Sequence, residues 1–316
     1  MSRHAEPKPP GATGLGSEAP LATGPAHALM HLTVFVWGFT AILGRLISIS
    51  ALPLVFYRLI VVVSVMPVII RWRGLALRVP PAQLRKFALV GALVAIHWLC
   101  FYGCIKYAGI AVAVLTLSTL TFFTALLEPL VFKRKLSVPE LVIGFGVMLG
   151  VSVLIKVETQ TDTLGLALGL GSALFSAGFG VLNGQLAREA RGEVMTFWEL
   201  LAATVVTALV FAAQPSQFVA PWSLTLADLG LLLLLGIGCT VLPWLWNLRV
   251  LKTLSPYALA LAVSLEPVYS MVLAWFIFPN AEQLTWRFYA GSSVLIALVA
   301  LNTWMRRPQQ PVPATS

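Results

Sequence analysis

Charged residues are scarce in this chain. Asp, Glu, Lys and Arg make up only 10% of its 316 residues, whereas about a quarter of the residues in a soluble domain are charged. Apolar residues make up 59%, and the mean hydropathy is +0.89. This composition excludes an ordinary soluble protein and indicates a protein whose main solvent is a lipid bilayer.

The motifs of several kinds of chemistry are missing as well. The sequence has no G-x-x-x-x-G-K-[ST] phosphate loop and no H-E-x-x-H zinc motif. Only His31 and His97 lie in or near the apolar stretches, and Cys100, Cys104 and Cys239 lack the further ligands that a zinc site needs. We therefore expect no enzyme, no pump driven by its own ATP hydrolysis, and no metal or cofactor.

Long apolar stretches dominate the chain. A helix needs roughly 20 apolar residues to cross a bilayer. Ten stretches of about this length occur, at residues 28–47, 52–70, 87–106, 110–132, 138–156, 163–185, 194–213, 226–247, 255–278 and 286–304. Backbone groups inside a bilayer must pair within the protein, and the sequence lacks the alternating strands of a closed barrel. The predicted fold is therefore all-α, with ten transmembrane helices.

The formal net charge of +9 is explained by membrane topology. Most of the 21 basic residues fall on the side of the predicted bilayer that holds both termini. Because cytoplasmic loops are rich in Lys and Arg, both termini are predicted to be cytoplasmic. We expect a disordered tail at 1–27, which is rich in Pro, Gly and Ala, and a second cytoplasmic tail at 305–316. The positive charge then implies no nucleic-acid partner.

The second half of the chain repeats features of the first. Three matches keep the same order in both halves: Phe35–Arg45 with Phe175–Gln185, Phe56–Leu59 with Phe197–Leu200, and Lys106 with Lys252. We therefore predict two five-helix repeats, at 28–156 and 163–304. Repeats with an odd number of spans enter the membrane in opposite directions, so we expect inverted halves with a substrate site between them near mid-membrane.

Four segments carry a family signature. They are W-G-F at Trp37–Phe39, F-Y-R at Phe56–Arg58, the stretch His97–Leu136, and Leu254–Tyr269, which contains L-E-P-V-Y. With these segments the chain resembles the EamA family of the drug/metabolite transporter superfamily over residues 28–306. The resemblance implies a two-bundle carrier of metabolites or amino acids, often an exporter, and we expect it in a bacterial cytoplasmic membrane. One departure is the basic run Lys133–Lys135, where the family often has an acidic residue.

Glu266 is the first candidate for substrate binding or ion coupling. It lies near the middle of the ninth stretch, and a charged side chain at membrane depth normally faces the protein interior. Pro267 follows it, and proline interrupts a helix because it lacks a backbone donor. The carboxyl group could bind a substrate amine or a proton, or it could be held by a fixed structural partner.

Other polar and aromatic residues of the apolar stretches are further candidates. Arg58 could clamp a substrate carboxylate, but Arg58 and Glu199, at equivalent places in the two halves, could also balance each other or other structural groups. His97 could relay protons or be a satisfied core residue. The remaining candidates are Trp37, Thr40, Trp98, Tyr102, Asn183 and Asn247.

These features predict a secondary carrier. Repeated halves with polar groups at mid-membrane favour alternating access over an open channel. We expect a small-molecule substrate, an amino acid or a related metabolite, with export as the direction and protons as a hypothetical coupling ion. The alternative is a translocase for lipids or lipid-linked substrates. The oligomeric state does not follow from the sequence.

Overall fold

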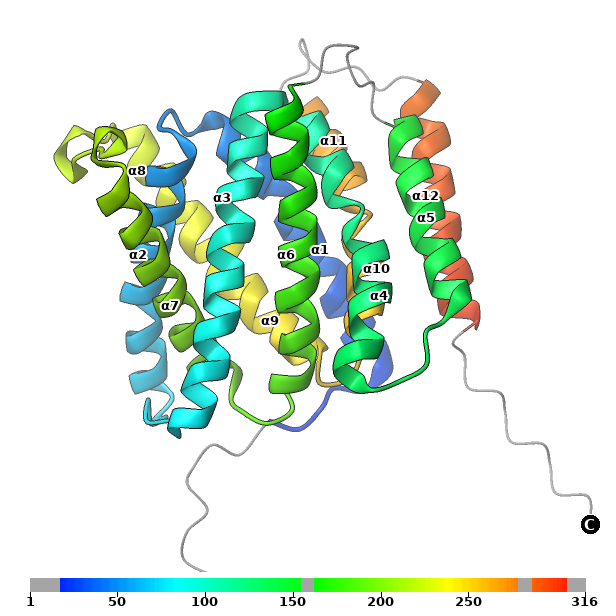
Figure 1. Ribbon diagram of the computed structural model, residues 1–316, viewed down its shortest axis with the longest axis horizontal. Helices are drawn as coiled ribbons and strands as arrows, with labels where there is room; N and C mark the ends of the chain where they lie inside the picture. Colours follow the sequence, from blue (N-terminus) through cyan, green and yellow to red (C-terminus); the bar gives the residue numbers. More distant parts are fainter. Residues whose placement is uncertain (1–17, 155–161, 278–285, 306–316) are drawn as a thin grey trace, which may run out of the picture.

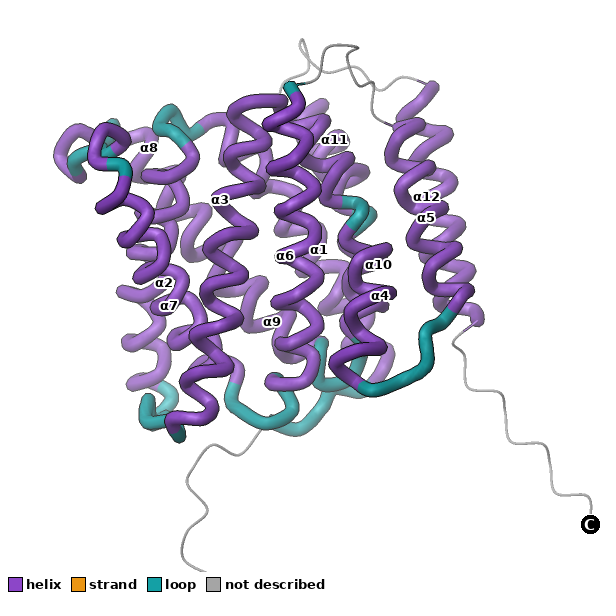
Figure 2. Tube along the Cα trace, in the orientation of Figure 1, coloured by secondary structure: helices purple, strands orange, loops and turns teal. Residues whose placement is uncertain are grey.

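The computed structural model describes residues 18–154, 162–277 and 286–305. All regular secondary structure within these ranges is helical, as predicted (Figures 1 and 2). The elements are α1 (Thr23–Leu46), α2 (Ala51–Trp72), α3 (Pro81–Leu117), α4 (Leu120–Phe132), α5 (Val138–Leu154), α6 (Thr163–Leu186), α7 (Gly192–Ala213), the short 3₁₀ helices η1 (Pro215–Gln217) and η2 (Pro221–Ser223), α8 (Leu226–Leu233), the π-helix η3 (Leu234–Val241), α9 (Leu242–Val250), α10 (Pro256–Val263), α11 (Glu266–Ile277) and α12 (Trp286–Met305).

Eight helical segments of the described chain are long and apolar enough to cross a membrane. They coincide with the first four predicted stretches and with the sixth to the ninth. Two shorter apolar helices, Val138–Ser152 and Tyr289–Asn302, lie within the fifth and tenth stretches. Each predicted stretch therefore contains an apolar helix, and eight of these helices reach spanning length.

The helices run between two ends of one bundle (Figure 1). Helix α1 begins at the lower end and α6 begins at the upper end, so the first helices of the two halves run in opposite directions. Helix α3 packs along α6 and α7, which joins the halves in the middle of the bundle, while α5 and α12 lie side by side at one edge.

A sharp turn at Gly109 joins two spans inside α3. The φ of Gly109 is +85°, in the left-handed region that favours glycine. Gly109 lies at the end of the spanning segment Pro81–Ile110, just before the next segment, Val112–Phe132. The third and fourth predicted stretches are thus connected by a bend rather than by a loop.

The fourth and ninth spans are each interrupted at a serine. One interruption lies between α3 and α4 and the other between α10 and α11. Ser118 and Ser264 each donate a hydroxyl hydrogen bond to the carbonyl oxygen three residues earlier. The distance along the chain from Ser118 to Ser264 equals that from Lys106 to Lys252. The interruptions therefore occupy equivalent positions of the two halves, and the first is visible at mid-height in Figure 2.

The N-terminal segment is ordered from residue 18. Helix α1 begins at Thr23, and Ala26 is fully buried. The prediction of a disordered tail at 1–27 is therefore wrong for its described part, whereas residues 1–17 lie outside the described residues. The second expected tail, after Met305, lies outside them too.

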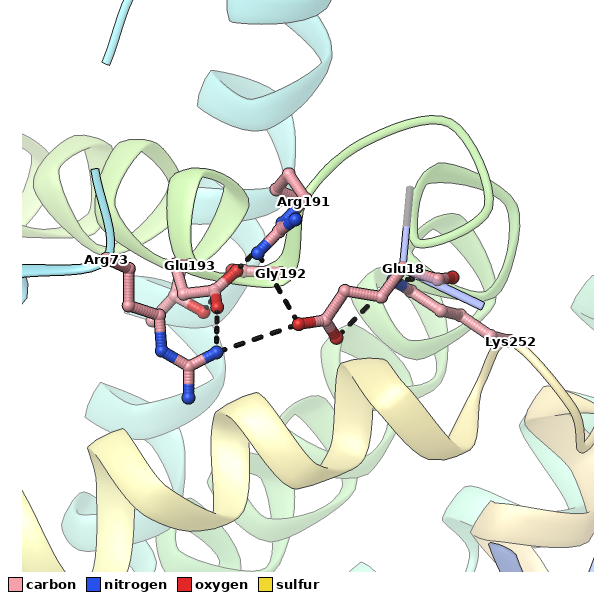
Figure 3. A network of polar contacts seen from close by, with 7 residues as sticks. Glu18, Arg73, Arg191, Gly192, Glu193 and Lys252 are labelled. Carbon is pink, nitrogen blue, oxygen red and sulfur yellow. Dashed lines mark hydrogen bonds and ion pairs between the residues drawn. The ribbon is translucent and has the colours of Figure 1, made fainter. Parts of the chain in front are cut away.

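Ion pairs of Glu18 explain this order (Figure 3). The Glu18 carboxylate lies 3.6 Å from Arg73, 3.6 Å from Arg191 and 4.0 Å from Lys252. Glu193 completes the network at 2.6 Å from Arg73. Burial lowers the pKa of Lys252, and the charge of Glu18 opposes that shift. The network ties the N-terminal segment to three connections between helices, which composition alone did not indicate.

Gly91 lets α3 and α7 pack backbone against backbone. A Cβ atom at this position would lie 2.1 Å from the carbonyl oxygen of Glu199 and 2.7 Å from the Cβ atom of Ala202. We expect Gly91→Ala to lower the free energy of unfolding by about 1–3 kcal/mol, the usual cost of overpacking. Thermal unfolding of the purified protein in detergent measures this loss.

Gly230→Ala is the matched control for this prediction. Gly230 lies on α8, and a Cβ atom there would meet no heavy atom within 4 Å. Alanine is the better helix former by about 1 kcal/mol, so this variant should unfold at the wild-type temperature or slightly above it. Equal melting temperatures for the two variants would contradict the close approach of α3 and α7.

Candidate functional site

A cavity lies between the two halves of the bundle. Helices α1 to α4 line it from the first half, and α6 and α9 to α11 line it from the second. Its empty volume is about 800 Å³, including space open to solvent. Of the candidates named from the sequence, the following line the cavity: Trp37, Thr40, Arg58, His97, Trp98, Tyr102, Asn247 and Glu266. Asn183 and Glu199 do not.

Arg58 is fixed in place by its neighbours. It lies on α2 with only 3% of its surface exposed. Its Nε donates to Thr240 Oγ1 at 2.7 Å, Nη1 donates to the Tyr102 hydroxyl at 2.8 Å, and the guanidinium lies 3.9 Å from the centre of the Trp98 ring. No carboxylate of the described residues forms an ion pair with it. A buried cation held only by neutral groups is suited to bind an anion.

The π-helix η3 places the acceptor for Arg58. Within it, the Thr240 hydroxyl donates to the carbonyl oxygen of Leu235, five residues earlier, at 2.7 Å. Gly236 brings the same π-helix against Val61 and the backbone carbonyl of Arg58. Short π-helical insertions are frequent at functional sites, and here the insertion aims a hydroxyl oxygen at the guanidinium.

Thr240→Val tests this support. Valine keeps the shape but leaves Nε of Arg58 without its acceptor, so we expect the free energy of unfolding to fall by about 1–3 kcal/mol. Thr240→Ser keeps the oxygen and should stay close to the wild type. Thermal unfolding in detergent compares the two, and a loss in Thr240→Ser with none in Thr240→Val would mean that the methyl group of Thr240 matters rather than its oxygen.

Glu266 faces the cavity without a protein partner. It is the first residue of α11 and is 4% exposed. Its carboxyl group makes no ion pair or hydrogen bond with the residues that the structure describes. Pro267 stands in the first turn of α11, where a missing backbone donor is tolerated, and the interruption lies just before, at Ser264 and Leu265. The end of a half-helix therefore presents the carboxyl group to the cavity.

Glu199 and Asn183 form a second polar cluster behind the cavity wall. The Glu199 Oε2 atom accepts hydrogen bonds from Asn183 Nδ2 and from Trp244 Nε1, both at 3.3 Å. Glu199 and Arg58 do not pair with each other, so of the alternatives raised from the sequence the structure favours separate partners. The two sites are distinct, with Trp244 between Glu199 and the cavity.

Trp98 and Trp244 are equivalent residues of the two halves. The distance along the chain between them equals that between Lys106 and Lys252. Their rings touch edge to face, with centroids 5.8 Å apart. Arg58 stacks on the ring of Trp98. Glu199, at the position of the second half that is equivalent to Arg58, accepts a hydrogen bond from the indole N–H of Trp244. In the sequence, the separation between Lys106 and Lys252, counted from Trp98 instead, leads to Trp244 and would have identified this pair.

Aromatic rings form one wall of the cavity. Phe179 stacks on Trp244 with ring centroids 5.5 Å apart, and the ring centroids of His97 and Phe101 lie 6.1 Å apart. His97 Nδ1 is 2.9 Å from both the carbonyl and the hydroxyl oxygen of Ser172, so its ring is held by α6. The sequence did not single out Phe101 and Phe179, because aromatic residues are common in apolar helices and only the packing distinguishes these two.

Glu128, like Glu266, lies in an apolar stretch and is followed by a proline, but it does not line the cavity. It accepts from Arg134 at 3.2 Å and from the backbone N–H of Tyr257 at 2.7 Å. Arg134 also pairs with Glu140 at 2.6 Å. This cluster connects α4, α5 and α10, and it therefore has the structural role that Glu266 lacks.

The comparisons with known proteins agree with this architecture. The model of the EamA-like transporter family matches residues 24–156 and again residues 163–304. Among 28 matching chains of solved structures, a crystal structure of a protein superposes with a TM-score of 0.73 at 17% identity, over 90% of this chain and 98% of the other. This likeness shows the fold alone. No curated protein matches the chain.

Two family matches together cover most of the chain, and they confirm the resemblance found in the sequence. Members of this family are membrane transporters of small solutes rather than enzymes, which agrees with a multi-pass helical protein that holds a cavity between its halves. The chain therefore belongs to the EamA-like transporter family.

Proposed function

We propose that the protein is a secondary carrier that moves neutral amino acids with apolar side chains, or closely related zwitterions, across the bacterial cytoplasmic membrane by alternating access. The observation that carries the proposal is the cavity lining. In the part of the chain that the structure describes, the lining holds one buried guanidinium without a carboxylate partner, Arg58, and one buried carboxyl group without a cation partner, Glu266. A zwitterion supplies both missing charges.

The chemistry of each end of an amino acid fits this lining. The planar fork of Arg58 suits a carboxylate better than a lysine would, and the Glu266 carboxylate suits an ammonium group. The aromatic wall offers an apolar surface to the side chain of the substrate. Buried charges are stabilised when they are paired, so binding the zwitterion lowers the free energy of both residues.

The two interrupted spans support alternating access. The interruptions at Ser118 and Ser264 flank the cavity, because Leu117, Leu120 and Val263 belong to its lining. Discontinuous helices at mid-membrane are typical substrate sites of carriers built from inverted repeats. We propose ten spans in two inverted repeats, 28–156 and 163–304, that rock against each other around these sites.

The topology proposed for the bundle has both termini in the cytoplasm. The connections from α2 to α3, from α6 to α7 and from α9 to α10 lie with the N-terminal segment at the lower end in Figure 1. They carry the basic residues Arg73, Arg191 and Lys252 of the network in Figure 3. Basic residues concentrate in cytoplasmic loops. For the direction we propose export, with the proton gradient as the energy source.

Counterflow in proteoliposomes tests the proposed function. Vesicles loaded with unlabelled leucine or phenylalanine should take up the same labelled amino acid faster than empty vesicles or vesicles without protein. Labelled glutamate and lysine should not exchange, because their third charge has no partner in the lining. Failure of both neutral amino acids to exchange, together with scrambling of a labelled lipid by the same vesicles, would instead support the lipid translocase.

A further inference from the structure

Three buried oxygen atoms in or beside the cavity wall accept no hydrogen bond from the residues that the structure describes. They are Glu199 Oε1, Asn183 Oδ1 and Asn247 Oδ1. The three residues are 0–2% exposed and come from α7, α6 and α9. Buried polar atoms are normally satisfied, so each exception calls for an explanation. All three atoms are acceptors, so each of them lacks a proton donor or a cation.

Within the described ranges no cationic side chain forms an ion pair with Glu199. The elements that contact α7 carry these basic side chains: Arg58 and Arg71 on α2, Arg85, Lys86, His97 and Lys106 on α3, and Arg249 on α9; Glu193 stands at the start of α7 itself. None of them pairs with Glu199 among the described residues. Several have other partners, since Arg58 binds Thr240 and Tyr102, Lys86 binds Glu189, and Glu193 binds Arg73.

A proton on Glu199 accounts for both observations. It removes a charge that would otherwise lie unpaired in the protein interior, and it turns Oε1 from an acceptor without a donor into a donor. Oε2 can accept from the neutral donors Asn183 Nδ2 and Trp244 Nε1 in either protonation state.

We propose that Glu199 is a proton-binding site separate from the substrate cavity. Glu266 lies in the cavity lining, where a substrate ammonium can reach it, but Glu199 does not belong to that lining. A substrate group therefore cannot neutralise Glu199, and only a proton or a small ion can. Glu266 thus binds the substrate, and Glu199 binds the proton.

Contacts connect this proton site to the cavity. Trp244 donates its N–H to Glu199, and its ring lines the cavity and touches Trp98. Trp98 in turn lies under the guanidinium of Arg58. Loss of the proton places a negative charge on the carboxyl group and strengthens the indole hydrogen bond, so protonation biases the position of the ring that adjoins the anion site. This coupling role rests on the proposed function, whereas the presence of the proton does not.

Infrared difference spectroscopy of the full-length protein in detergent tests the proton directly. Glu266→Gln serves as the background, because it removes the other unpaired carboxyl group. We expect a stretching band of a protonated carboxyl group in this variant and its loss when Glu199→Gln is added. Glu189→Gln, which removes a surface carboxyl group paired with Lys86, should leave the band unchanged.

A second variant keeps the proposal testable if Glu199→Gln fails to fold. Trp244→Phe keeps a ring but removes the indole donor, and it should shift the frequency of the band. A band that survives unshifted in both variants would overturn the proposal. So would the absence of the band together with stabilisation by sodium chloride but not by choline chloride, which would indicate a sodium site at an ionised Glu199.

The coupling role has its own readout in proteoliposomes. With labelled leucine, Glu199→Gln should retain counterflow but lose accumulation driven by a pH gradient, and Glu266→Gln should lose both. A Glu199→Gln protein that still accumulates leucine along the pH gradient would overturn the coupling role. Absence of counterflow in the wild type would refute the proposed function, while the infrared result would still decide the proton site.

Discussion

Glu266→Gln is expected to reduce the affinity for leucine or phenylalanine by about 10-fold to 100-fold. The substitution keeps the size of the side chain and removes its charge, and a hydrogen bond to a charged group contributes about 1.5–3 kcal/mol. Because Glu266 has no protein partner among the described residues, glutamine leaves no other buried group unpaired. The folded protein should therefore be as abundant and as thermally stable as the wild type, and the loss should appear in binding.

Binding of labelled leucine to the purified protein measures this effect. Glu189→Gln is the matched control, since it removes the same charge at a surface site paired with Lys86. Glu266→Asp should retain part of the affinity, because the charge remains. Wild-type affinity in Glu266→Gln would remove this residue from the substrate site.

Arg58→Lys should lower the affinity for the same amino acids by a similar factor, although the charge is retained. An ammonium group is a point charge with no planar fork, so it cannot hold Thr240 and Tyr102 and also present paired donors to a carboxylate. The stacking on Trp98 is lost as well. Arg58→Gln, which also removes the charge, should bind more weakly still.

Stability separates the two interpretations of Arg58. Because the neighbours of Arg58 are neutral, Arg58→Lys should lower the free energy of unfolding by less than it weakens the free energy of leucine binding. Thermal unfolding and leucine binding on the same preparation give the two values. A loss of folded protein that accounts for the whole loss of binding would show that Arg58 serves only the fold.

The helical fold could be predicted from the sequence because the bilayer leaves few alternatives. An apolar stretch such as 194–213 has to be a helix, and α7 (Gly192–Ala213) matches it within two residues. The cost of burying charge likewise predicted that Arg58 and Glu266 face the interior, and both line the cavity. These predictions rest on large free energies that act on each segment separately.

What depends on packing between segments could not be predicted in this way. The composition of the first residues indicated disorder, but Glu18 forms ion pairs with residues far away in the chain. Asn183 and Glu199 were grouped with the cavity residues because all are polar and at membrane depth, yet the rotation of α6 and α7 places them behind Trp244. The role of Thr240 depends on a π-helix that no local pattern in the sequence indicated.

In the proposed complex the cavity holds a zwitterion with its carboxylate at Arg58 and its ammonium at Glu266. Three ligands test this arrangement: leucine, isopentylamine, which lacks the carboxylate, and 4-methylpentanoate, which lacks the amine. Binding of each is measured to the wild type, Arg58→Gln and Glu266→Gln. Arg58→Gln should weaken the binding of leucine and 4-methylpentanoate but not that of isopentylamine. Glu266→Gln should weaken the binding of leucine and isopentylamine but not that of 4-methylpentanoate. Equal effects of both variants on all three ligands would contradict the account.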